Sequence, residues 1–237
     1  YKSYGENYVG DKMSDGLKSE LTRIFDNRYD KFVNNIAKAR KIDKNTLDTD
    51  IVNGNDTSLT PFTARDKKLV DKLEGLQDLT QRLGITEEKM VDIYDYYHDH
   101  SAEIEDKNIG NDTIAVIYAE GSIIDSSAGN DRTISISPDS ISTKLEKALR
   151  TKNLKGIVLR VNSPGGSALA SEVIYQALSK TNVPIYVSMS ETAASGGYYI
   201  SMAGKKVFAD NATITGSIGV VSMMPKFYNA QNKYGVT

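Results

Sequence analysis

Two apolar segments, each followed at once by a glycine-rich turn, constrain the fold of this chain most strongly. Residues 156–161 (GIVLRV) precede the turn 162–167 (NSPGGS), and residues 183–189 (VPIYVSM) precede the turn 191–199 (ETAASGGYY). Short apolar runs bounded by turns are typical of buried strands, and glycine lets the backbone turn sharply into a helix. Strands that alternate with helices in this way predict an α/β domain with a parallel sheet and right-handed connections.

Further strands and helices extend this pattern through the second half of the chain. We predict strands at 113–118 and 206–209, and helices at 167–180 and 195–203. A helix is also predicted to begin at Ser137, because serine followed by proline is a favoured N-cap and first helical position.

One serine, Ser195, lies in the second glycine turn between small residues. A strand that ends in a small-residue turn and opens a helix leaves such a hydroxyl accessible, and glycines let a substrate approach the backbone N–H groups. Two such units in tandem predict a nucleophile beside an oxyanion hole. On glycine content alone, the simpler interpretation is two tight β–α turns in an ordinary α/β domain.

The base that would activate this serine is not evident from the residues. The two histidines, His98 and His100, lie in a polar and aromatic stretch without a glycine turn, so a Ser-His-Asp triad has little support. With Asp95 or Asp99 nearby they could ligate a metal, but a lone His-x-His is a weak signal and we interpret both as surface residues. The remaining candidate bases are lysines, and the sequence pattern alone does not indicate which lysine is the base.

The first part of the chain has helical rather than strand periodicity. Apolar residues recur at three- and four-residue steps over 14–41, with Ser14 as the predicted N-cap. Residues 43–63 are rich in Asp, Asn, Thr and Gly and are predicted to form a loop. Helical spacing resumes over 64–84, interrupted at Gly75 and ending at Gly84 as the C-cap.

These patterns divide the chain into a mainly helical part over 1–100, a charged linker over 101–112 and an α/β unit over 113–237. Residues 1–12 are predicted to be a short extended lead.

Composition excludes several classes of protein. The formal net charge is −2 over 237 residues, so no nucleic-acid partner is indicated. There is no cysteine, which excludes a disulfide framework, a thiol nucleophile and a cysteine-based zinc site. The Gly-x-Gly-x-x-Gly dinucleotide fingerprint is missing, and we predict no cofactor and no metal. No apolar run approaches the roughly 18 residues of a membrane span.

Three motifs in the second half occur in a specific order, at 157–167 (IVLRVNSPGGS), 193–198 (AASGGY) and 214–219 (ITGSIG). Together they resemble the second catalytic unit of the signal peptide peptidase A, or protease IV, family in its long form. Residues 1–3 (YKS) and the segment after them resemble the end of the first unit. The chain is therefore interpreted as a piece that spans the end of one unit and the start of the next.

The resemblance implies a serine endopeptidase with a Ser/Lys dyad. Carried over to this sequence, the nucleophile is Ser195 and the general base is Lys2. A lysine acts as a base near neutral pH only if its pKa falls well below its ordinary value of about 10.4. Because Lys2 is the second residue, we expect the isolated chain to be a weak enzyme unless this terminus is held in place.

The same resemblance implies an oxyanion hole made by the backbone N–H groups of Gly196 and of Gly165 or Gly166. Tyr198 is a candidate for the substrate groove, with core packing as the alternative.

At the level of the molecule, the resemblance implies a crotonase/Clp-protease-like ββα superhelix with a parallel sheet, preceded here by an α-helical segment. The expected substrates are peptides, in particular cleaved signal peptides. The expected location is the bacterial inner membrane, reached through a region absent from this chain, with the catalytic part on the periplasmic or extracytoplasmic side. A homo-oligomer is expected as well.

Two other functions use the same fold. In acyl-CoA hydratases and isomerases, paired N–H groups hold a thioester enolate, and such enzymes generally rely on acidic residues in the pocket. The nearest acid here, Glu191, precedes the turn and is not obviously placed for this role. The other function is that of a non-catalytic assembly module.

Overall fold

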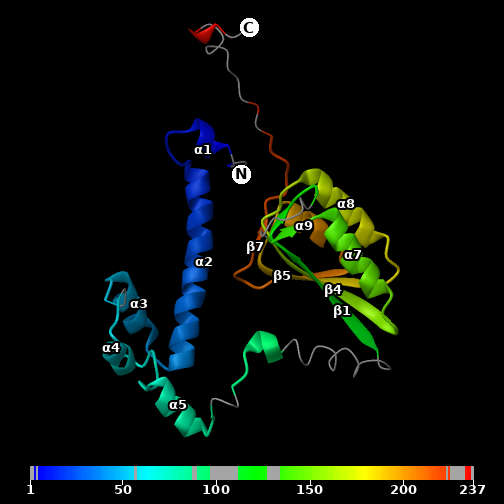
Figure 1. The fold of residues 1–237 in the computed structure, drawn as a ribbon. Coiled ribbons are helices and arrows are strands. Elements are labelled where there is room, and N and C mark those ends of the chain that lie inside the picture. The colour runs from blue at the N-terminus through cyan, green and yellow to red at the C-terminus, as the bar shows by residue number, and fades with distance from the viewer. Residues whose placement is uncertain are drawn as a thin grey trace. The chain divides into compact units, whose positions relative to one another are not determined.

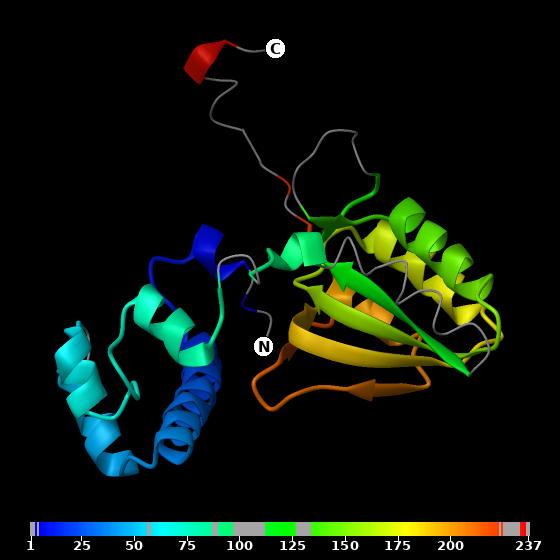
Figure 2. The same cartoon turned by 60° about the horizontal axis from the view of Figure 1, so that its bottom comes forward.

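The computed structural model describes residues 3, 5–55, 58–86, 90–96, 112–126, 134–222, 224 and 233–235. The chain divides into two compact units, Tyr1–Ile109 and Gly110–Thr237 (Figures 1 and 2). The predicted linker over 101–112 lies outside the described residues, apart from Asp112.

The first unit is helical. Its helices are α1 (Glu6–Val9), α2 (Asp15–Arg40), α3 (Lys44–Val52), α4 (Pro61–Asp66) and α5 (Leu76–Leu83). The predicted long helix is confirmed as α2: the Ser14 side chain accepts a hydrogen bond from the N–H of Leu17, and the helix ends where Lys41 adopts a left-handed conformation.

Three predictions for this unit are wrong. Residues 43–63 are not a loop, because the Asp43 side chain caps α3 by accepting from the N–H of Thr46, and the helix buries Leu47. Residues 64–84 are not one interrupted helix: α4 ends at Asp66, and helix resumes only at Leu76, although Gly84 is the left-handed C-cap as predicted. The lead over 1–12 is not all extended, since it contains α1.

The helical unit has a small core. Val33 and Ala37 of α2 and Leu47 of α3 are buried together, with Tyr29 and Leu69 among the side chains packed against them. The Tyr29 hydroxyl donates to Asp48 at 2.6 Å, which ties α2 to α3 beside this core.

The second unit is built on a parallel sheet. Its strands are β1 (Thr113–Glu120), β4 (Leu154–Ser163), β5 (Ile185–Ala194), β6 (Lys206–Phe208) and β7 (Ile214–Gly216), with β2 (Ser122–Ile123) and β3 (Ser135–Ile136) paired separately. The order is β1-β4-β5-β6, and β7 also pairs with β5. All pairings are parallel, so the predicted α/β class with a parallel sheet, preceded by a helical segment, is confirmed.

Strand β5 is shared between two partners along its length. Its first half pairs with β6 through residues 186–188, and its last three residues pair with β7 through residues 192–194. The last three residues of β5 are therefore held by β7 and not by β6.

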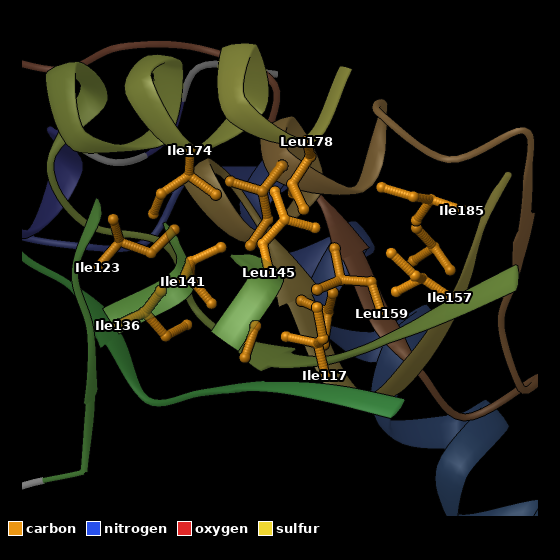
Figure 3. Close-up of a cluster of buried hydrophobic side chains, with 14 of the residues drawn as sticks. Ile117, Ile123, Ile136, Ile141, Leu145, Ile157, Leu159, Ile174, Leu178 and Ile185 are labelled. Carbon is orange, nitrogen blue, oxygen red and sulfur yellow. The ribbon is translucent and has the colours of Figure 1, made fainter. Parts of the chain in front are cut away.

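Helices α7 (Pro138–Leu149) and α8 (Ala168–Ser179) cover one face of the sheet (Figure 1). The predicted cap of α7 is confirmed: Ser137 and Ser140 form a reciprocal capping box, with Pro138 at the first position. Figure 3 shows Ile141 and Leu145 of α7 directed toward the same buried cluster as Ile174 of α8. Burial of this apolar cluster is the main stabilising contribution to the unit.

The opposite face of β1 carries apolar side chains that remain exposed. Ile114, Val116 and Tyr118 are 63%, 52% and 55% exposed, whereas the alternate residues Ile117 and Ala119 are buried.

Across the described residues, every helix is too short or too polar to span a bilayer.

Candidate active site

Ser195 lies at the junction between β5 and helix α9 (Gly196–Ser201). Its backbone has φ 51° and ψ −120°, a conformation that residues with a side chain rarely adopt and that costs about 1–3 kcal/mol. The sharp strand-to-helix turn has the character of a nucleophile elbow, in which strain presents a serine hydroxyl. Among the described residues, the Ser195 hydroxyl has no hydrogen-bond partner.

The strand that leads to Ser195 is braced by β7 and the residues before it. The N–H of Ser195 donates to the carbonyl of Gly216 at 2.9 Å. The hydroxyls of Thr213 and Thr215 donate to the carbonyls of Ser190 and Ala193 at 2.7 and 2.8 Å. These bonds fix the backbone on which the strained turn is built, and such over-determination is what allows strain to persist.

The first glycine turn, over 162–167, lies against the second, over 191–199. It follows β4 and contains Gly165 and Gly166, with φ values of 98° and 151°. A Cβ atom added to Gly165 would lie 2.8 Å from the Cβ of Ser195 and 2.6 Å from the nitrogen of Gly196. Only glycine permits this close approach, because any side chain at this position would overlap the Ser195 turn. The two glycine turns identified in the sequence therefore lie in contact.

The N–H groups around Ser195 differ in availability. The N–H of Gly165 donates to the buried Ser163 hydroxyl at 3.1 Å. In the described part of the chain, the N–H groups of Gly166 and Gly196 have no hydrogen-bond partner. Of the two glycines predicted as alternatives, Gly166 is therefore the one with a free donor.

The two tyrosines of the second turn have different environments. Tyr198 is partly buried and packs against the core of the sheet, as the alternative interpretation expects. Tyr199 is 39% exposed, and its hydroxyl donates to the Glu172 carboxylate on α8. The Tyr199 hydroxyl and the Gln176 amide hold the pKa of Glu172 below its ordinary value, and the bond to Glu172 raises the pKa of Tyr199.

The predicted base and the two histidines cannot be placed. Lys2, His98 and His100 lie outside the described residues. Within the residues that are described, no group of three or more His, Asp or Glu side chains could hold a metal ion.

Two buried serines near the site were missed by sequence reasoning. Ser163 accepts from Gly165, and the hydroxyl of Ser171 donates to the carbonyl of Ser167 at 2.7 Å. Both side chains are fully buried. The sequence signal was a serine at an inward-facing position of a strand or helix, which periodicity alone treats as a small core residue.

The model of peptidase family S49 matches residues 1–90 and 177–237, which include both Lys2 and Ser195. The chain belongs to peptidase family S49. The predicted membership of the signal peptide peptidase A/protease IV family is thereby confirmed.

Relatives of this S49 chain are longer. It is 34% identical over 255 residues to Protease 4 of Haemophilus influenzae, covering all of this chain but 40% of that protein. It is 44% identical over 98 residues to a putative signal peptide peptidase SppA of Enterococcus faecium, covering 40% of this chain and 28% of that one. Among solved structures it is similar to a mutant of ClpP1 from Listeria monocytogenes, with TM-score 0.31 and 19% identity over 38% of this chain and 46% of that one.

Proposed function

We propose that this chain carries the nucleophile and the oxyanion hole of a serine endopeptidase that works with a Ser/Lys dyad. The observation that carries the proposal is the strained backbone of Ser195, held at the end of β5 against the Gly165 turn. Membership of peptidase family S49 supports the same reaction.

In this proposal the Ser195 hydroxyl attacks a peptide carbonyl. The carbonyl oxygen becomes an oxyanion, which accepts hydrogen bonds from the free N–H groups of Gly166 and Gly196. Each such donor is worth about 3 kcal/mol in the transition state. The amine leaves, and water then hydrolyses the acyl-enzyme to regenerate the serine.

Lys2 is the proposed general base. In its neutral form it takes the proton of the Ser195 hydroxyl and later gives it to the leaving amine. Support comes from the resemblance of residues 1–3 to the family's lysine segment and from the match of the family model to this stretch. The free Ser195 hydroxyl among the described residues leaves a position for such a base.

The proposed substrates are peptides, in particular the remnants of cleaved signal peptides. This rests on the name of the Enterococcus faecium relative and on the small residues around Ser195. We further propose a protein associated with the bacterial inner membrane and active as a homo-oligomer, with catalysis on the extracytoplasmic side.

The test is turnover of a peptide substrate by the intact protein and by two serine variants. Ser195→Ala should abolish turnover while thermal unfolding stays close to wild type, because one partly buried hydroxyl without a described partner is removed. Ser188→Ala is the matched control: it lies on β5 and its hydroxyl accepts from Arg160 at 2.7 Å. It should retain turnover. Turnover by Ser195→Ala at the wild-type rate would refute the proposal.

A further inference from the structure

A buried hydroxyl on α8 connects the two glycine turns. Ser171 lies in the first turn of α8 and is 0% exposed. Its hydroxyl donates to the carbonyl of Ser167 at 2.7 Å. Ser167 follows Gly166 directly, so this bond holds the residue next to one of the two free N–H groups.

The same hydroxyl lies against the other turn. A Cβ atom added to Gly196 would be 2.4 Å from the Ser171 Oγ and 3.3 Å from the Cα of Gly165. The side of Gly196 that lacks a side chain is therefore filled by Ser171, by the Ile123 side chain, whose Cδ1 would be 3.1 Å away, and by the Gly165 turn. One side chain thus bonds to the residue after Gly166 and contacts Gly196.

Ser167 itself is held from several directions. Its hydroxyl accepts from the N–H of Ala170 and donates to the Asp125 carboxylate. Its carbonyl accepts from both the N–H and the hydroxyl of Ser171. Because the N–H bond would remain, loss of the Ser171 hydroxyl leaves no unsatisfied carbonyl, and the helix should still form.

We propose that Ser171 is a positioning residue that sets the separation between the N–H groups of Gly166 and Gly196. The inference rests on the proposed function, in which both groups bind the oxyanion. Oxyanion donors act only when they lie about 2.7–3.1 Å from the developing charge, so a small shift of one turn lowers the rate. Ser171 touches no substrate atom and acts through the two turns alone.

The test compares Ser171→Ala with Ser201→Ala in the intact protein. Ser201 is the matched control, since it is also 0% exposed and its hydroxyl donates to a carbonyl four residues earlier, that of Gly197, at 2.7 Å. Ser171→Ala should lower kcat about tenfold, less than the 10²–10³ lost with an oxyanion donor itself, with KM and the pH profile unchanged. Ser201→Ala should leave kcat close to wild type, because the Ser201 hydroxyl bonds to the carbonyl of Gly197 and not to Ser167.

The outcomes separate the two claims. Wild-type kcat for Ser171→Ala, or an equal loss for Ser201→Ala, would overturn the positioning role. Turnover by Ser195→Ala, measured alongside, would instead overturn the proposed function. If thermal unfolding shows that Ser171→Ala does not fold, Ser171→Cys takes its place with the same expectation, because a thiol fills a similar volume but donates weakly.

Discussion

At the scale of single residues, the site depends on positions where no side chain fits. The Gly165 backbone has φ 98°, and an added Cβ would overlap the Gly196 nitrogen, the Ser195 Cβ and the Ala194 carbonyl oxygen at 2.6–2.9 Å. These contacts are with rigid groups, so the turn would have to move away from Ser195.

Gly165→Ala should therefore inactivate the protein and destabilise it. We expect kcat/KM to fall at least about 10²-fold, the effect of roughly 1 Å of misplacement. The free energy of unfolding should fall by about 1–3 kcal/mol from the unfavourable φ. The control is Gly156→Ala on β4, the strand that leads into this turn, where an added Cβ meets only the Pro184 carbonyl at 3.6 Å. Equal kcat/KM for the two variants would show that the turns need not touch.

The identity of the base gives a second prediction at this scale. If neutral Lys2 is the base, kcat/KM should rise toward alkaline pH with a single ionisation, because the protonated amine cannot accept the serine proton. Lys2→Ala should lower kcat by about 10²–10⁴, the usual contribution of a general base. Replacing His98 and His100 by Gln should leave the rate nearly unchanged. A hundredfold loss in that double variant would favour a histidine base instead.

Sequence reasoning identified the glycines and Ser195 because a strand, a glycine turn and a helix form a local pattern. It did not identify Ser163 or Ser171, whose roles depend on which backbone groups lie opposite their hydroxyls after folding. It also left Gly165 and Gly166 as equal candidates, and only the bond from Gly165 to Ser163 separates them.

At the scale of elements, α8 and α9 are joined at the surface by the Tyr199–Glu172 bond, and Tyr175 packs on the Tyr199 ring at 5.4 Å between centroids. The bond lowers the pKa of Glu172, so the stability it provides is present above the ordinary glutamate pKa of about 4.3 and is lost as pH falls through the lowered value. It also raises the pKa of Tyr199, so stability is lost as pH rises through that raised value.

Tyr199→Phe should accordingly lower the unfolding midpoint near neutral pH, and the difference from wild type should shrink at strongly acidic pH. Melting curves across the pH range measure this. Tyr175→Phe is the control, because it keeps the ring and its hydroxyl makes no hydrogen bond among the described residues. A difference for Tyr199→Phe that does not change with pH would contradict this assignment.

The errors of element prediction have a physical cause. Residues such as Asp43 and Thr60 favour a loop in the sequence, yet their side chains cap α3 and α4. The apolar spacing over 64–84 predicts a helix, but Lys68 adopts a left-handed conformation and ends the turn after α4. The apolar residues between Lys68 and α5 are therefore not helical. Strands β2, β3 and β7 have two or three residues each, too few to show a periodicity.

At the scale of the whole molecule, both units expose apolar side chains. Phe25 and Phe32 of α2 are 63% and 55% exposed, and β1 exposes Ile114 and Val116. Exposed apolar surface of this kind commonly marks an interface.

We therefore predict that the intact protein is oligomeric at micromolar concentration, as measured by light scattering. Exchanging both Phe25 and Phe32 for Glu should reduce the assembly, whereas Asn35→Glu, an exposed polar position on the same helix, should not. A strictly monomeric wild-type protein would contradict this prediction.

The most direct test of the account is to locate the covalent bond it requires. The intact protein would be treated with a fluorophosphonate, which reacts with activated serines, and the adduct mapped by peptide mass spectrometry. We predict one adduct, on Ser195, formed at a rate that rises with pH and absent from Ser195→Ala. An adduct on another serine of the active wild-type protein, or undiminished labelling of Ser195→Ala, would contradict the assignment of the nucleophile.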